Sequence, residues 1–363
     1  MKRIPKNREE LDKLLDRGIP YKDIDVSMVE DLSYLFACNI TEDTEPDEDE
    51  NYKTHQFKGE EGLENWNVSS ACCKTNYMFL NCIQLVGDKV FAHWNVSHVT
   101  EMYGMFEGCS SFTGESIANW DVSNVTDMMS LFEGCTSFTG KSISSWNVRK
   151  VQNMDSMFSG CSSFTGEGLS RWNVSKVTHM SWMFNKCYLF TGDSLANWDV
   201  TNVTNMDGTF CNCRDFTGKS LINWNVSNVT SMSWMFSGCT SFTGESLINW
   251  NVSKVVDMKW MFQECNSFTG ESLVNWDVTK VREMNSMFTE CSSFTGDSLE
   301  KWDVSNVVDM SFMFMNCPVF TGKGIRKWDL SKVKKQDHMF SGCHSYSKNK
   351  SFLRRLFGFL FDK

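Results

Sequence analysis

The sequence predicts a repeat solenoid, in which short similar units stack on one another to form a continuous core. Ten tryptophans recur every 26 residues, from Trp94 to Trp328. A cysteine follows each of them at a fixed distance, and a Phe-Thr-Gly turn follows nearly all of them. A period of this length is typical of units that cannot bury their apolar side alone and therefore stack.

Each repeat divides into three local patterns, counted from the tryptophan as position 0. The consensus is W-[N/D]-V-[S/T]-x-V-[T/V]-x-M-x-x-M-F-x-x-C-x-x-F-T-G-x-[S/G]-[L/I]-x-x. The run L-x-x-W-x-V, as at Leu221, Trp224 and Val226, predicts one short parallel β-strand per coil. The V-x-x-M-x-x-M-F segment has three-residue spacing, which predicts a tight 3₁₀ or helical arc. Gly244 and its equivalents end the turn, and we expect them at positive φ.

This repeat resembles that of the BspA-like leucine-rich-repeat surface proteins, in the branch with a 26-residue unit. The shared residues are the pair Met235 and Phe236, then Cys239 and Phe242 at steps of three, and the string W-[N/D]-V-S-N-V-T at 120–126. The likeness covers roughly residues 24–343. It implies a leucine-rich-repeat-like solenoid and a bacterial-type or virus-borne interaction protein, without implying a chemistry.

The ends of the chain depart from the repeat. The sequence divides into an N-terminal cap helix with a degenerate first coil (1–40), an acidic insertion (41–65), a solenoid of about eleven coils (66–343) and a basic, aromatic C-terminal cap or tail (344–363). Asn7 and Glu10 have the spacing of a capping box, and Ile24 takes the tryptophan position of the first coil. We expect the acidic insertion to be a solvated loop.

Composition narrows the class of protein. The net charge of −10 argues against non-specific binding of nucleic acid. No apolar run approaches the roughly 20 residues that span a membrane, and the first residues lack the apolar stretch of a secretory signal. We therefore expect a cytoplasmic protein. The family resemblance makes the cell surface, or secretion by a non-classical route, the alternative.

The cysteines at position 15 are expected to be small buried packing groups. They recur once per coil, so their side chains would lie parallel, about 4.8 Å apart. A disulfide needs Cβ atoms about 3.8 Å apart and converging, and zinc needs ligands from several directions. Unpaired thiols also favour a reducing compartment. The column comprises Cys109, Cys135, Cys161, Cys187, Cys213, Cys239, Cys265, Cys291, Cys317 and Cys343. Oxidation of Cys38, Cys72, Cys73 or Cys211, outside this column, stays open.

The sequence predicts no catalytic residue, no metal site and no cofactor. None of the six histidines lies near a serine, cysteine or carboxylate at the spacing of a triad or a metal site. Glycine-rich nucleotide-binding loops are absent. The Asn or Asp after each tryptophan is expected to bond to neighbouring backbone groups rather than to calcium. We therefore expect that the protein is not an enzyme.

Partner-binding residues are expected where coils differ. Position 10 is small in half of the coils, so aromatic residues there are surplus to folding and resemble a binding hot spot. These residues are Trp182, Trp234, Trp260 and Phe312, with Tyr103 one position earlier in its coil. A purely packing role for half-buried rings is an equal alternative. The expected strand face offers a second candidate, the apolar strip Ile222, Ile248 and Val274.

Together these features predict a non-enzymatic protein–protein interaction module with a protein partner. The alternative is a structural component that self-associates weakly, head to tail, through its acidic N-terminal and basic C-terminal ends. For the C-terminal tail, covering the last coil is favoured over contact with a membrane surface.

Overall fold

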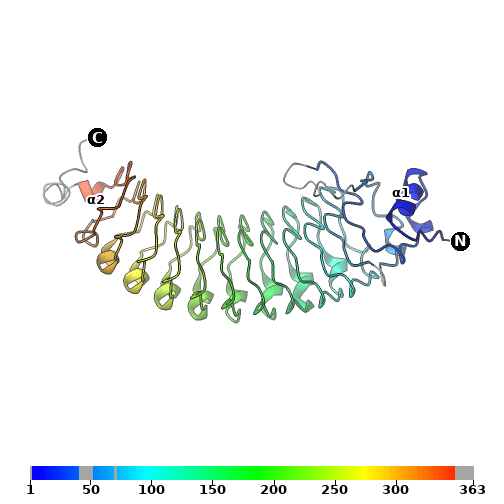
Figure 1. The fold of residues 1–363 in the computed structure, drawn as a ribbon, viewed down its shortest axis with the longest axis horizontal. Helices are drawn as coiled ribbons and strands as arrows, with labels where there is room; N and C mark the ends of the chain where they lie inside the picture. The colour runs from blue at the N-terminus through cyan, green and yellow to red at the C-terminus, as the bar shows by residue number, and fades with distance from the viewer. Residues whose placement is uncertain (1, 41–51, 69–71, 348–363) are drawn as a thin grey trace. The chain divides into compact units, whose positions relative to one another are not determined.

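The computed structural model describes residues 2–40, 52–68 and 72–347, in two compact units, Met1–His179 and Met180–Lys363. Within each unit, successive coils stack in chain order (Figure 1). The first unit contains α1 (Arg8–Asp16) and the 3₁₀ helices η1 (Tyr21–Asp23), η2 (Leu63–Asn65), η3 (Glu115–Ile117), η4 (Lys141–Ser145) and η5 (Glu167–Leu169). The second contains η6 (Asp193–Leu195), η7 (Lys219–Asn223), η8 (Glu245–Asn249), η9 (Glu271–Asn275), η10 (Asp297–Lys301) and the short α2 (His344–Ser347).

Helix α1 begins at the predicted residue. The Asn7 side-chain oxygen accepts a hydrogen bond from the backbone N–H of Glu10 at 3.0 Å, which satisfies one free donor of the first turn. The Glu10 carboxylate accepts from the backbone N–H of Lys6 at 2.9 Å, one residue before the partner of a standard capping box. Leu11 and Leu15 turn the apolar face of the helix into the core.

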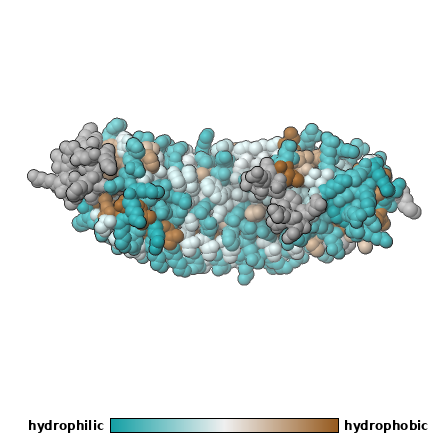
Figure 2. All heavy atoms as spheres, turned by 45° about the horizontal axis from the view of Figure 1, so that its top comes forward, coloured by the Kyte–Doolittle hydropathy of each residue, from teal (hydrophilic) through white to brown (hydrophobic). Residues whose placement is uncertain are grey.

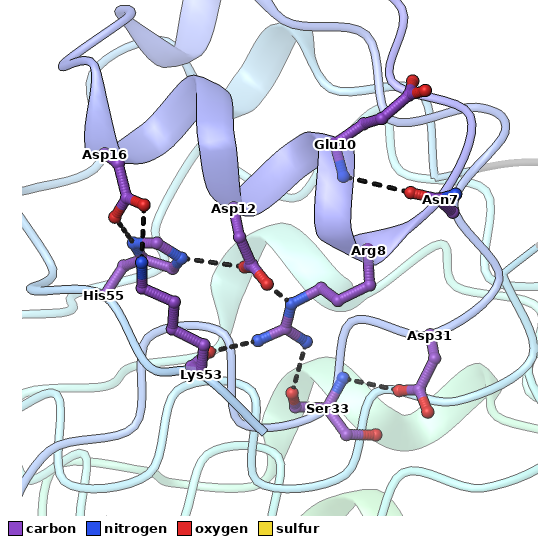
Figure 3. A network of polar contacts seen from close by, with 9 residues as sticks. All are labelled: Asn7, Arg8, Glu10, Asp12, Asp16, Asp31, Ser33, Lys53 and His55. Atoms are coloured by element: carbon purple, nitrogen blue, oxygen red, sulfur yellow. Dashed lines mark hydrogen bonds and ion pairs between the residues drawn. The ribbon is translucent and has the colours of Figure 1, made fainter. Parts of the chain in front are cut away.

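Part of the acidic insertion packs against α1 instead of lying free in solvent. The Arg8 guanidinium contacts Asp12 at 3.0 Å and donates to the Lys53 carbonyl at 2.5 Å (Figure 3). The His55 ring nitrogen lies 2.8 Å from the Asp12 carboxylate. The prediction of a solvated loop is therefore wrong for the part that contains Lys53 and His55. Residues 41–51 of the insertion, and 348–363 of the predicted tail, lie outside the described residues.

Two columns of phenylalanine, at positions 12 and 18, form the core of each unit. The Phe262 ring lies 4.3 Å from Phe268 of its own coil and 5.7 Å from both Phe236 and Phe288 of the neighbouring coils. All four side chains are fully buried. Such offset stacks contribute attraction beyond the burial of apolar area.

The glycine of the Phe-Thr-Gly turn is required for two reasons. Gly244 has a φ of +80°, in the left-handed region that glycine adopts without strain, as predicted. A Cβ atom on Gly244 would also lie 2.2 Å from the Phe268 ring of the next coil. A larger residue at Gly244 would therefore be strained in this backbone conformation, and its side chain would clash with the Phe268 ring.

The secondary structure around the tryptophan is the reverse of the prediction. In place of a strand, the residues before Trp224 form η7, because Leu221 and Trp224 are three apart and a 3₁₀ turn places such residues on one side. Parallel β pairing within the described residues is limited to isolated bridges, most of them at position 7, for example Asp257 to Glu283. The predicted arc carries the inter-coil backbone hydrogen bonds instead, such as the Trp234 N–H to the Lys259 carbonyl at 3.0 Å.

The tryptophan at position 0 supplies a hydrogen bond as well as bulk. The indole N–H of Trp276 donates to the Leu247 carbonyl of the preceding coil at 3.2 Å, and Trp302 repeats this contact with Leu273 at 3.0 Å. Buried polar groups are costly when unpaired, and indole combines an apolar body with a donor. A leucine in this position would fill the core but would not bond to the carbonyl.

The cysteine column is hydrogen-bonded. No disulfide joins cysteines among the described residues, and Cys265 is fully buried, with its Sγ 2.9 Å from the Phe236 carbonyl. Burial raises the pKa of the Cys265 thiol well above its usual range, which keeps it protonated and able to donate.

The residue after each tryptophan closes a local turn, in which Asn251 Oδ1 accepts from the Ser253 N–H at 3.1 Å.

Candidate interaction surface

The residues at position 10 all adopt the left-handed backbone conformation where they are described. Trp234 has a φ of +61°, Trp260 of +55° and Phe312 of +62°. Gly208 and Ser286 have φ values of +59° and +57° at the same position. Any residue with a Cβ, serine included, pays about 1–2 kcal/mol in this region, which glycine does not. The framework therefore favours glycine here, and the large rings are held at a cost.

The aromatic rings of the second unit are ordered against one another. Trp234 and Trp260 stack with centroids 4.4 Å apart and planes at 15°, and Phe312 stacks on His338 at 5.4 Å. Trp182 lies over the next coil, since a Cβ on its neighbour there would come within 2.3 Å of the indole. The three tryptophans are half-buried, and Phe312 is 36% exposed. Sequence alone indicates neither the stacking nor the backbone conformation.

In the first unit, tyrosines occupy the equivalent of position 10 in two coils, and the 26-residue period of the tryptophans does not identify them. Tyr34 lies ten residues after Ile24, and Tyr77, eleven after Trp66, is its equivalent in a coil with one extra residue; their ring centroids are 5.1 Å apart. Tyr103, the predicted neighbour of the column, is half-buried and lies edge-on to Tyr77 at 5.3 Å. The tryptophan spacing misses these coils, but Tyr77 directly precedes the pair Met78 and Phe79, as Trp234 precedes its own Met-Phe pair. Counting from that pair finds them.

The second predicted face lies on 3₁₀ helices rather than on a strand. Ile222 on η7 is 40% exposed, Ile248 on η8 is 37% exposed, and Val274 on η9 is half-buried. These side chains are adjacent but carry no unusual backbone conformation. On the face that Figure 2 shows, hydrophobic residues form small separate patches among residues of hydrophilic and intermediate hydropathy. Nothing in this strip exceeds what an ordinary protein surface displays.

Carboxylates accompany the rings in the second unit. Asp257, Glu283 and Asp309 occupy position 7 of three consecutive coils and are joined by parallel bridges. Lys259 pairs with Asp257 at 2.9 Å, and Lys335 pairs with Asp309 at 3.5 Å. Within the described part of the chain, Glu283 has no salt bridge. Burial, followed by its two acidic neighbours, raises the pKa of Glu283.

The first unit contains a carboxyl group that titrates near neutrality. Burial raises the pKa of Glu107 to about 7, and Glu133 of the next coil adds to the rise. Between its usual pKa and about 7, the folded protein binds more protons than the unfolded chain, so stability falls as pH rises through this window. We expect Glu107→Gln to remove this fall and to raise the free energy of unfolding at pH 8 by on the order of 1 kcal/mol. Urea titrations at pH 4.5, 6 and 8 measure it.

The exposed Glu115 on η3 provides the matched control for this prediction. Glu115→Gln removes the same charge from the same unit and should leave the pH dependence of the wild type in place. Equal pH slopes for wild type and Glu107→Gln would contradict the prediction.

The described residues contain neither a metal-binding cluster nor a membrane-spanning helix. No group of three or more His, Cys, Asp or Glu side chains there is placed to hold a metal ion. No helix among them is long and apolar enough to cross a membrane.

Comparison with known proteins agrees with the repeat. One family model matches the chain three times in succession, over residues 46–168, 157–271 and 230–352. No curated protein matches the chain. The three matches together span most of the sequence, and their overlap is that expected of a tandem array of similar coils. The chain therefore belongs to the family described as "Mycoplasma protein of unknown function, DUF285".

Proposed function

We propose that this chain is a non-enzymatic protein–protein interaction module of the BspA-like, leucine-rich-repeat type, which binds its partner through the position-10 rings. One observation carries the proposal. Trp182, Trp234, Trp260 and Phe312 hold a left-handed conformation that glycine or serine fills in other coils. Local backbone strain is concentrated in proteins at binding and catalytic sites. Rings kept at such a cost, and half open to solvent, have a use other than folding.

The form of these rings suits recognition. Tryptophan is among the residues most enriched at the energetic centres of protein interfaces. The stacked pair Trp234 and Trp260 is already ordered in the free protein, so little side-chain entropy remains to be lost on binding. A rigid, half-exposed aromatic pair therefore offers a partner large contact area at low cost.

The finer assignment to the BspA-like type rests on the repeat itself. The Met-Phe pair, the cysteine and phenylalanine that follow it, and the W-[N/D]-V-S-N-V-T string support it. The alternative of head-to-tail self-association depends on charged segments that lie mostly at 41–51 and 348–363, outside the described residues.

The proposal is tested by capture with two matched variants. The variant Trp182→Ser, Trp234→Ser, Trp260→Ser, Phe312→Ser should release a partner that the wild type retains from a lysate of the source cell. The variant Ile222→Ser, Ile248→Ser, Val274→Ser alters the second candidate face and should retain it. The captured protein, once purified, should bind the first variant about tenfold more weakly or worse, which equals about 1.4 kcal/mol.

The opposite pattern would contradict the proposal. If the partner is lost only when Ile222, Ile248 and Val274 are replaced, recognition lies on the 3₁₀ face. If the partner binds both variants as it binds the wild type, neither face recognises it.

A further inference from the structure

The position-10 column has a gap in the second unit, at Ser286, between Trp260 and Phe312. Trp260 stacks on Trp234 of the preceding coil at 4.4 Å, and Phe312 stacks on His338 of the following coil at 5.4 Å. Ser286 lies between the two stacks and brings no ring to either of them. Each stack therefore ends in a ring whose second face is directed toward the gap.

The width of this gap follows from the spacing of the coils. The backbone N–H of Trp260 bonds to Asn285 at 3.0 Å, and that of Ser286 bonds to Ser311 at 2.8 Å, so the three coils are directly paired. Paired backbones lie about 4.8 Å apart, which places the two ring positions about 10 Å apart. Carbon atoms in contact are about 3.5–4 Å apart, so one side chain fits between the rings. Ser286 itself is only 7% exposed and closes the floor.

In the sequence, a carboxylate residue lies on each side of Ser286. Glu283 precedes Ser286 by three residues, and Glu290 follows it by four. Glu283 is half-buried and lies between Asp257 and Asp309, whereas Glu290 is exposed. The lysines near Glu283 already pair with those two aspartates. Glu283 is thus a partly desolvated carboxylate that forms no salt bridge within the described chain, although the charges of Lys259 and Lys335 act on it from a distance.

We infer that the slot formed by Trp260, Phe312 and Ser286, with Glu283 beside it, binds an arginine or lysine side chain of a basic peptide segment in a protein partner. This inference rests on the proposed function and names the chemistry of the partner. A cation over the face of a tryptophan gains about 0.5–2 kcal/mol, with the larger value in desolvated sites. A nearby carboxylate adds a charge-assisted hydrogen bond and fixes the position of the cation.

Charge decides between this occupant and others. An apolar side chain would fill the slot but would take more water from Glu283 without giving it a partner, which is unfavourable. An anionic segment would face Glu283, Glu290 and the net charge of −10. A basic side chain satisfies the rings and the carboxylate at once. Burial and the two neighbouring aspartates raise the pKa of Glu283, and a bound cation would lower it again.

Binding of a defined peptide tests the inference. The probe is a fluorescent peptide of three Gly-Ser-Arg repeats, and its control is the same peptide with citrulline, which keeps the shape of arginine and removes its charge. Anisotropy titrations measure the Kd of each with wild type, Ser286→Trp, Glu283→Gln and Glu271→Gln. Ser286→Trp fills the slot with a ring at a position where Trp234 and Trp260 have the same backbone conformation. Glu271→Gln removes the same charge from the exposed surface of η9.

The expected result is tighter binding of the arginine peptide than of the citrulline peptide, by about tenfold or more. Ser286→Trp and Glu283→Gln should each weaken binding of the arginine peptide by a similar factor, and Glu271→Gln should change it less than about twofold. Equal affinity for the two peptides would overturn the inference. So would an unchanged affinity in Ser286→Trp or in Glu283→Gln, or an equal loss in Glu271→Gln.

The outcomes also separate this inference from the proposed function. If the variant with serine at the four ring positions loses its captured partner while Ser286→Trp still binds the peptide, the ring column is a binding site and the basic occupant is wrong. If neither variant changes binding of the partner or the peptide, both proposals fail.

Discussion

Replacing Gly244 by alanine should lower the free energy of unfolding by about 2–5 kcal/mol. The left-handed backbone, with a φ of +80°, accounts for about 1–2 kcal/mol of this loss. The rest comes from overpacking, since the new Cβ would lie 2.2 Å from a Phe268 ring atom. Phe268 is stacked on Phe242 at 5.8 Å and on Phe294 at 6.0 Å, so the ring has little room to move. Urea unfolding measures the effect.

Gly160 is the matched control for this change. Its φ is +75°, but a Cβ there meets no atom closer than 3.4 Å. Gly160→Ala therefore isolates the backbone cost and should lose only about 1–2 kcal/mol. Equal losses for the two alanine variants would show that contact with Phe268 does not explain the glycine of the turn.

Truncation of Phe262 to alanine is expected to cost about 3–5 kcal/mol. The side chain is fully buried and joins the two phenylalanine columns, with Phe268 at 4.3 Å and Phe288 at 5.7 Å. Its removal leaves a cavity that both neighbouring coils line. Because stability in a solenoid depends on contacts between adjacent repeats, the loss should lower the urea midpoint of the second unit.

The comparison with Phe312→Ala keeps the residue type constant and changes only the position. Phe312 is 36% exposed and has a φ of +62°. Its truncation should cost less than about 1.5 kcal/mol, because it loses one ring contact with His338 and little buried area. A loss as large as that for Phe262→Ala would place Phe312 in the framework.

The period of the sequence predicts the repeat architecture and the core but not the local backbone. Burial of the tryptophan, phenylalanine and cysteine columns follows from their regular spacing. The spacing of Leu221 and Trp224 suits both a leucine-rich-repeat strand and a 3₁₀ turn, and the structure forms η7 there. The inter-coil hydrogen bonds lie instead in the M-x-x-M-F segment, where left-handed residues at positions 10 and 14 interrupt continuous strand geometry.

The candidate site was predictable by residue type and not by conformation. Variation at position 10 singles out the rings, and Gly104 and Gly208 in the same column hint at a left-handed turn. The tryptophans in the same column argue against a left-handed turn, because bulky residues at positive φ are rare and no sequence rule predicts them. Contacts such as that between His55 and Asp12 join residues far apart in the sequence, and no periodic pattern foretells them.

Equilibrium unfolding of the variant with serine at Trp182, Trp234, Trp260 and Phe312 tests most directly whether these rings are surplus to folding. Ser130 and Ser156 already occupy this column with φ values of +51° and +54°, so serine fits the backbone. We predict a cooperative transition and a total loss below about 4 kcal/mol, or about 1 kcal/mol per ring. Four framework aromatics would each cost about 3–5 kcal/mol. Four such residues would together lower the free energy of unfolding by about 12 kcal/mol or more. A loss of that size, or a variant that fails to fold, would contradict the account.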